Sequence, residues 1–118
     1  MTNVETGKLG EVLAEKFLKK SGYKILERNY RNKVGEIDII AREGDCIVFV
    51  EVKTRQSDSF GMPFEAVNAA KRRKIKGTAL MYMKTFKTEP MVRFDVISVM
   101  IDGQNNQIQH IKDAINEG

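Results

Sequence analysis

The chain has 118 residues, 42% of them hydrophobic and 31% charged, and its 20 basic and 16 acidic residues give a net charge of +4. This length and composition are typical of one globular domain, so we expect a single domain over residues 1–118 and exclude collagen-like, disulfide-stapled and strongly disordered classes. The longest apolar run, residues 46–50, is far shorter than the roughly 20 residues of a membrane-spanning helix, which excludes that class as well.

A first helix is predicted at the N-terminus, where Thr2-x-x-Glu5 has the pattern of a capping box. Its end is predicted at Ser21-Gly22, because glycine is a natural residue for the turn after a helix and two lysines precede it. The apolar stripe of this helix is expected to consist of Leu9, Val12, Leu13 and Phe17.

Three β-rich segments follow the first helix. Residues 23–30 are predicted to form a strand because apolar and polar side chains alternate at its start. Residues 36–41 and 46–53 are joined by a short loop that contains Gly44, a pattern typical of an antiparallel hairpin. The density of apolar residues in both runs predicts that both faces of this hairpin are covered.

The second half of the chain continues the alternation of elements. A loop is predicted over residues 56–63, and a second long helix is predicted from about residue 64 or 68 to about residue 84. A strand over residues 92–101, a turn over 102–106 and a last edge strand over 107–114 are expected to follow. This order predicts an α/β fold in which helices flank a mixed sheet.

The basic residues are concentrated in one stretch of the chain. Residues 66–87 contain seven lysines and arginines and no acid, whereas the rest of the chain has 13 basic and 16 acidic residues. A clustered positive patch is typical of a protein that binds a phosphate backbone. An ordinary solvated helix face is the alternative interpretation.

The predicted hairpin carries charged residues where a covered strand should have none. Asp38 lies between two isoleucines, Glu51 lies between two valines, and Lys53 projects from the same face as Glu51. Because a buried carboxylate must be paired or bound to a metal, the two acids are candidates to hold one hard cation such as Mg²⁺. A cross-strand ion pair between Glu51 and Lys53 is the alternative.

The spacing Asp38-x₁₂-Glu51-x-Lys53 resembles the catalytic signature of the PD-(D/E)XK superfamily, which has the restriction-endonuclease-like fold; Ile37 replaces the proline of that name. Longer segments resemble the YraN-like family of small uncharacterised bacterial proteins. They are Gly7-x-x-Gly10-Glu11-x-x-Ala14-x-x-Phe17-Leu18, Gly22-Tyr23-x-Ile25-Leu26-x-x-Asn29-Tyr30-Arg31, Gly35-Glu36-Ile37-Asp38-Ile39-Ile40-Ala41, Val48-Phe49-Val50-Glu51-Val52-Lys53-Thr54-Arg55 and Arg93-Phe94-Asp95-Val96. The layout is also similar to that of the archaeal Holliday-junction resolvases.

The resemblance implies roles for several residues. Asp38 and Glu51 would bind Mg²⁺ or Mn²⁺, and Lys53 would serve the attacking water and the scissile phosphate. Glu11 lies in line with Ala14 on the first helix, at the border of its apolar stripe, and its position resembles that of the helix-1 glutamate of the resolvases. It is expected to complete the metal shell, with an ordinary surface glutamate as the alternative.

Five basic residues are candidates for contact with nucleic acid. Lys71 is the charged member of a helical face that is otherwise apolar or small, formed with Val67, Ile75, Thr78 and Tyr82. It is expected either to reach a phosphate or to extend its ammonium group into solvent. Arg55 is a second candidate, because residues 51, 53 and 55 of a strand project from the same face. The other three candidates are Arg73, Lys74 and Lys76, which point away from the apolar stripe of the helix.

Together these inferences favour a cytoplasmic, metal-dependent DNA endonuclease with branched or damaged DNA among its substrates. The cytoplasm is expected because the N-terminal residues lack a secretory signal and because a single cysteine, Cys46, forms no internal disulfide. No membrane partner is expected, and a homodimer is compatible with the resemblance. One alternative is a non-catalytic nucleic-acid-binding module or partner subunit that keeps the nuclease-like fold. Another is a structural domain whose acids pair with neighbouring lysines.

Overall fold

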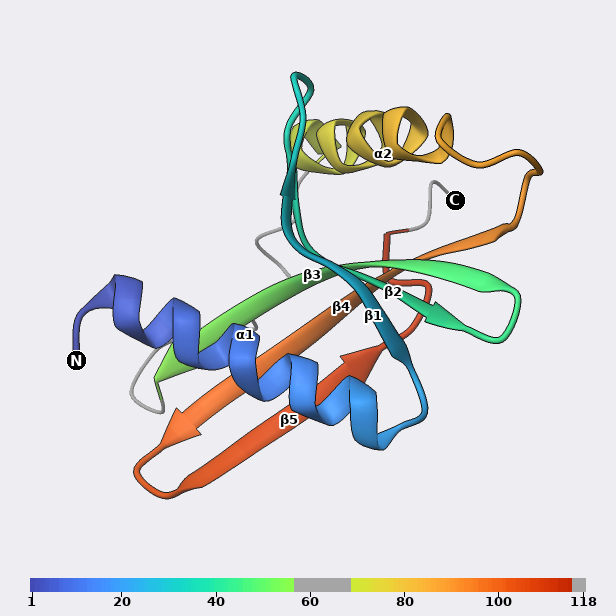
Figure 1. The fold of residues 1–118 in the computed structure, drawn as a ribbon. Coiled ribbons are helices and arrows are strands. Elements are labelled where there is room, and N and C mark those ends of the chain that lie inside the picture. The colour runs from blue at the N-terminus through green and yellow to red at the C-terminus, as the bar shows by residue number, and fades with distance from the viewer. Residues whose placement is uncertain (57–68, 116–118) are drawn as a thin grey trace.

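The computed structural model describes residues 1–56 and 69–115, which form one five-stranded mixed sheet with a helix on each face (Figure 1). The strands lie in the order β1-β2-β3-β4-β5, and all neighbours are antiparallel except the parallel pair β3 and β4. The elements are α1 (Asn3–Lys20), β1 (Lys24–Arg31), β2 (Glu36–Glu43), β3 (Cys46–Gln56), α2 (Ala69–Met83), β4 (Met91–Asp102) and β5 (Asn105–Ile111). The predicted α/β fold with a mixed sheet and flanking helices is confirmed.

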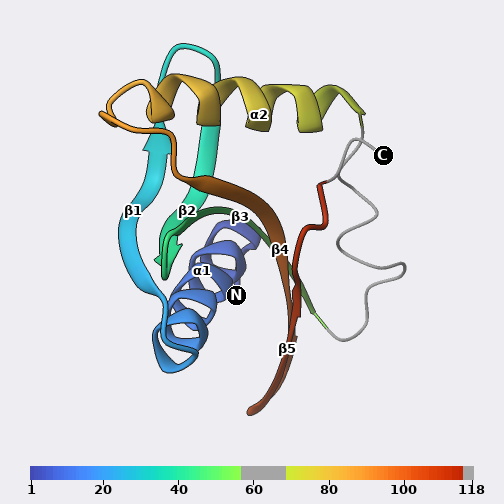
Figure 2. The same cartoon turned by 90° about the vertical axis from the view of Figure 1, so that its right-hand side faces the viewer.

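Two apolar clusters, one on each face of the sheet, form the core. The cluster under α1 contains Leu18, Val48 and Val50, and the cluster under α2 contains Phe49 and Ile75. Because β3 contributes alternate residues to the two clusters, both of its faces are covered, as its apolar density predicted. Figure 2 shows the two helices at separate levels, with the sheet twisting between them.

The first helix begins with the predicted capping box between Thr2 and Glu5, but the predicted apolar stripe is wrong in part. The buried residues of α1 are Thr6, Gly10, Ala14 and Leu18, whereas Val12 is 48% exposed. The small size of Gly10 explains the difference. A Cβ atom there would lie 1.8 Å from the hydroxyl oxygen of Thr54, so only glycine lets the helix lie this close to β3.

The predicted hairpin of β2 and β3 is confirmed, and both strands extend beyond their predicted ends. β2 continues to Glu43 and β3 to Gln56, and a turn at Gly44 and Asp45 joins them. Gly44 has a φ of 58°, a backbone conformation that glycine adopts at little cost.

The second half of the chain differs from the prediction mainly at its turns. Residues 57–68 lie outside the described ranges, and with them most of the predicted loop, the predicted helix start and Val67. Ile75, Thr78 and Tyr82 of α2 are buried as the helical periodicity predicted. The turn predicted over 102–106 is shorter, because Asp102 already pairs with Asn105 and Gly103 has a φ of 58°. The edge strand therefore begins earlier than predicted and ends at residue 111 rather than 114.

No helix within residues 1–56 and 69–115 combines the length and hydropathy of a membrane-spanning segment.

Candidate active site

The candidate active site lies where strands β2 and β3 separate, a place that we call the fork. The last paired residues of the two strands are Ile39 and Val50, after which β2 stays paired only with β1 and β3 only with β4. Figure 1 shows the β1–β2 hairpin rising to α2 while β3 runs on towards the N-terminal half of α1. Asp38 and Glu51 are the first residues beyond the paired region, so the topology brings both acids to one place.

The two carboxyl groups of the fork contact each other. The backbone N–H of Val52 donates a hydrogen bond of 2.8 Å to Asp38 Oδ2 and fixes that side chain across the fork. Glu51 is only 8% exposed. Burial, the negative charge of Asp38 and a hydrogen bond with Asp38 raise the pKa of Glu51 to about 8. At neutral pH the pair therefore holds one proton, which the Glu51 carboxyl group donates to Asp38.

Two lysines complete this polar group, and their environments differ. Lys71 Nζ of α2 lies 3.4 Å from Glu51 Oε1. Burial lowers the pKa of the Lys53 amine, and a hydrogen bond with Lys71 lowers it further. Burial also lowers the pKa of Lys71, but its hydrogen bond with Lys53 and its contact with Glu51 outweigh that effect and raise the pKa overall. Lys71 is therefore the firmly charged partner, and Lys53 is the amine that releases its proton more readily.

The structure brings Glu11 and Arg55 to the same place. A cavity of about 310 Å³ is lined by Glu11, Asp38, Glu51 and Arg55, among others. Glu11 is half-buried beside Gly10 of α1. Burial and the charge of Asp38 raise its pKa, and a hydrogen bond with Asn29 opposes this rise. Glu11 therefore lines the same cavity as Asp38 and Glu51, and its role as a metal ligand stays a prediction.

The chemistry of the fork fits a hard divalent cation. Oxygen donors suit Mg²⁺, which binds through one or two carboxylates and keeps several water molecules. Asp38 and Glu51 provide two carboxylates so close that they share a proton when no cation separates them. Within the described ranges, no three or more acidic, histidine or cysteine side chains gather closely enough to hold an ion by themselves. Asp38 and Glu51 are the pair that would hold it, and Glu11 lines the same cavity.

The remaining predicted basic residues lie on α2. Arg73 and Lys74 are exposed, and Lys76 is half-buried. None of the three lines the cavity at the fork, but Lys74 lines a larger groove beside Lys71. Lys71, in contrast, lines this groove and also contacts the fork.

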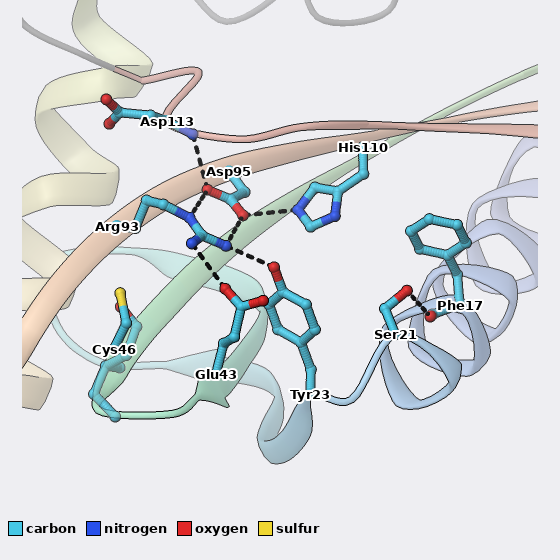
Figure 3. Close-up of polar contacts among 10 residues, drawn as sticks. Phe17, Ser21, Tyr23, Glu43, Cys46, Arg93, Asp95, His110 and Asp113 are labelled. Atoms are coloured by element: carbon cyan, nitrogen blue, oxygen red, sulfur yellow. Dashed lines mark hydrogen bonds and ion pairs between the residues drawn. The ribbon is translucent and has the colours of Figure 1, made fainter.

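A second polar cluster, which sequence reasoning missed, lies on the α1 face of the sheet (Figure 3). Asp95 is fully buried and accepts two hydrogen bonds of 2.9 Å from Arg93, and its Oδ2 lies 2.7 Å from His110 Nε2. Arg93 also donates to Glu43 and to the hydroxyl of Tyr23. Residues 93 and 95 of a strand project from the same face, and this spacing would have indicated that Arg93 and Asp95 are neighbours. No pattern in the sequence indicated that His110 lies beside them.

This cluster ties together strands β2, β4 and β5 and the segment after α1. Burial raises the pKa of Asp95, but hydrogen bonds from His110, Arg93 and the backbone N–H of Asp113 outweigh it and lower the pKa overall. Asp95 is therefore held as a carboxylate whose acceptors are occupied by neighbouring donors. This arrangement is typical of a structural polar network rather than of a group that awaits a substrate.

The fold and the site define an α/β protein consistent with the restriction-endonuclease-like fold, with a carboxylate pair and a lysine at the point where two strands separate. The family model described as "Uncharacterised protein family UPF0102" matches residues 10–99. The chain belongs to this family, which is the family of YraN-like proteins that the sequence motifs indicated.

Bacterial relatives match nearly the whole chain. A UPF0102 protein of Syntrophus aciditrophicus is 50% identical over 113 residues, which cover 95% of this chain and 89% of the relative. A UPF0102 protein of Thermodesulfovibrio yellowstonii is 49% identical over 114 residues, covering 97% and 98%. A third, from Syntrophomonas wolfei, is 46% identical over 113 residues, covering 95% and 98%.

Proposed function

We propose that this protein is a Mg²⁺-dependent DNA endonuclease of the cytoplasm that hydrolyses phosphodiester bonds at the fork. The observation that carries the proposal is the contact between the buried Glu51 and the half-buried Asp38, with the amine of Lys53 beside them. Two acids that line a cavity and a base-competent amine beside them are the groups that phosphodiester hydrolysis requires. An α/β fold consistent with the restriction-endonuclease-like class supports the same conclusion.

Each residue of the fork has a distinct part in this proposal. Asp38 and Glu51 hold a cation, and Glu11 supports it from across the cavity. A divalent cation bound there would supply Lewis-acid polarisation of the scissile phosphate. Lys53 orients the attacking water and, as a neutral amine, accepts its proton, because burial has lowered the pKa of that amine. Lys71, firmly charged, contacts the phosphate that the substrate brings to the cavity.

A non-catalytic nucleic-acid-binding module is the alternative function. The basic face of α2, which has five lysines and arginines and no acid between Ala69 and Met83, supports binding with or without cleavage. The fork favours the enzyme, because a pure binder gains nothing from two acids that face an anionic ligand.

The test is a cleavage assay on branched, linear duplex and single-stranded DNA with Mg²⁺, Mn²⁺ or a chelator. The wild type is expected to cut at least one of these substrates with a metal and none with the chelator. Asp38→Asn is expected to abolish cutting, whereas Lys16→Ala, which removes an exposed cation on α1, is expected to keep it. A wild type that binds DNA but cuts none of the substrates with either metal would favour the binding module.

Salt dependence tests the DNA partner separately from the chemistry. Affinity is expected to fall steeply as salt rises, because phosphates that bind cationic side chains release their counterions. Charge reversal at Arg73, Lys74 and Lys76 is expected to weaken binding equally for all sequences. An affinity that stays flat between low and moderate salt would identify α2 as a solvated face and would contradict the proposed partner.

A further inference from the structure

A groove of about 580 Å³ lies between the tip of the β1–β2 hairpin and α2. Its walls come from two elements far apart in the sequence, and Figure 2 shows the hairpin tip beside α2. The lining residues are Arg31, Asn32, Lys33, Val34, Gly35 and Glu36 of the hairpin and Ala70, Lys71, Lys74 and Ile75 of α2. We call it the hairpin groove.

Specific contacts hold the hairpin tip in place against α2. The Asn32 side-chain amide donates hydrogen bonds of 3.2 Å to the backbone carbonyl of Thr78 and to the hydroxyl of Tyr30. Its carbonyl oxygen accepts a hydrogen bond of 2.9 Å from the backbone N–H of Val34. A Cβ atom at Gly35 would lie 3.0 Å from the Thr78 hydroxyl oxygen. The tip therefore packs on the helix through its small residues and through Asn32, and the shape of the groove is set by the fold.

The charges of the groove favour an anionic ligand. Four cationic side chains and one carboxylate line it, which gives the lining a net charge of +3. The carboxylate of Glu36 is occupied by Arg31, at 2.6 Å. Lys33 and Lys74 are exposed and make no ion pair with any carboxylate in the described ranges. These two ammonium groups, one on each wall, are the cations that a ligand can bind without displacing an acidic partner.

We propose that the hairpin groove binds the backbone of a single-stranded nucleic-acid segment that leads away from the fork. This inference rests on the proposed function, because Lys71 both lines the groove and contacts Glu51, so a strand bound in the groove would pass directly to the carboxylate pair. The groove's volume of about 580 Å³ lies within the range of pockets that hold one small ligand, so we assign to it one strand rather than a duplex.

The lining residues also predict whether the groove distinguishes one base from another. A positive groove that follows the backbone is one half of the usual single-strand binding site, and aromatic platforms for stacking bases are the other half. None of the lining residues is aromatic. Binding is therefore expected to depend on charge and strand geometry and to be independent of base identity.

The test measures binding of three labelled DNA molecules by fluorescence anisotropy in the presence of a chelator, so that no cleavage occurs. They are a blunt duplex, the same duplex with a single-stranded arm, and the arm alone. The wild type is expected to bind the arm-bearing duplex more tightly than the blunt one. Lys33→Ala and Lys74→Ala are each expected to weaken that binding on the order of tenfold. Each is expected to reduce the slope of log affinity against log salt by about 0.7.

Two matched variants control for general effects of charge. Lys16→Ala removes an exposed cation from α1, on the opposite face of the sheet, and is expected to leave the arm preference unchanged. Lys33→Arg keeps the charge at the tip and is expected to retain wild-type affinity.

The outcomes separate this inference from the proposed function. Equal affinity for the blunt and arm-bearing duplexes, or equal losses in Lys33→Ala and Lys16→Ala, would overturn the hairpin groove while cleavage at the fork could still stand. An arm preference that depends on Lys33, in a protein that never cuts DNA, would support the groove and overturn the nuclease. A wild type that binds none of the three molecules would overturn both.

Discussion

The proton shared at the fork leads to a sharp prediction for Glu51→Gln. Glutamine has the shape of a protonated glutamate and can donate the same hydrogen bond to Asp38, but it cannot ionise. The variant therefore keeps an uncharged side chain at position 51 at every pH, whereas the wild type loses its uncharged carboxyl group when Glu51 ionises. We expect Glu51→Gln to make the metal-free protein more stable than the wild type at alkaline pH and equally stable only below about pH 4.5, where Glu51 is protonated in both the folded and the unfolded wild type.

The magnitude follows from the raised pKa. Burial and the neighbouring Asp38 raise the pKa of Glu51 from 4.5 to about 8. The folded chain thus holds the proton to a higher pH than the unfolded chain, so stability is fully present below pH 4.5 and is lost as the pH rises through 8. One pKa unit corresponds to about 1.4 kcal/mol, so the loss is about 5 kcal/mol at most. This loss is expected in the wild type and not in Glu51→Gln.

The assay is urea unfolding of both proteins with a chelator, at several values of pH from about 3.5 to about 9, roughly one unit beyond the two pKa values of 4.5 and about 8. The quantity compared is the difference in the free energy of unfolding, because other titrating groups affect both proteins equally and cancel. Glu89→Gln is the matched control, since Glu89 is exposed and its carboxylate makes no ion pair within the described ranges. It is expected to follow the wild type at every pH.

Adding Mg²⁺ or Mn²⁺ at pH 8 completes the experiment. A cation that binds only the folded chain stabilises it by about 1.4 kcal/mol when its concentration is roughly ten times the dissociation constant. We expect this gain in the wild type and a much smaller one in Glu51→Gln, which lacks one ligand charge. A stability difference that does not change with pH would refute the shared proton, and equal gains from metal in both proteins would refute the metal site.

Three further predictions concern single side chains. Lys53→Ala is expected to abolish cleavage with little change in DNA affinity, whereas Lys71→Ala is expected to lower both, which a cleavage time course beside a binding isotherm would measure. Asp95→Asn is expected to destabilise the chain by about 3 kcal/mol in urea unfolding, because an amide group cannot accept all the hydrogen bonds that this buried carboxylate accepts. The pKa of Asp95 is lowered, so its contribution to stability is present above pH 3.8 and is lost below it; the variant is expected to lack that acid-dependent loss. Asn32→Ala is expected to weaken binding of arm-bearing DNA without changing the net charge, because it releases the hairpin tip from Thr78.

The sequence predicted the fork because the chemistry of Asp38 and Glu51 contradicts the apolar strands around them. A charged residue between apolar neighbours is visible in the sequence alone. It predicts a partner for the carboxylate whatever the position of the strand in the sheet, because an unpaired acid is costly to bury. The hairpin of β2 and β3 was also predictable from local sequence, because a short glycine-containing loop sets the register of its two strands. The order of the elements, the β2–β3 hairpin and the proximity of the two acids were therefore predictable from neighbouring residues alone.

Features that depend on long-range packing were not predictable in the same way. The apolar stripe of α1 was wrong in part because Gly10 and Thr54, which are 44 positions apart, decide which side of the helix lies on the sheet. His110 meets Asp95 only because β5 pairs antiparallel with β4. The hairpin groove likewise needs β1, β2 and α2 together, so neither Arg31 nor Lys33 was conspicuous in the sequence.

The two lysines of the fork show why residue type alone does not assign a chemical role. Lys53 lies on β3 beside both the carboxylate pair and Lys71, so burial and a neighbouring cation both favour its neutral amine. Lys71 reaches the same place from α2, where Glu51 and the Lys53 amine favour its charged form. A hydrolytic site needs one group that can accept a proton and one that stays positive beside the phosphate. The fold provides both from two identical side chains, because it brings one from β3 and the other from the helix above it.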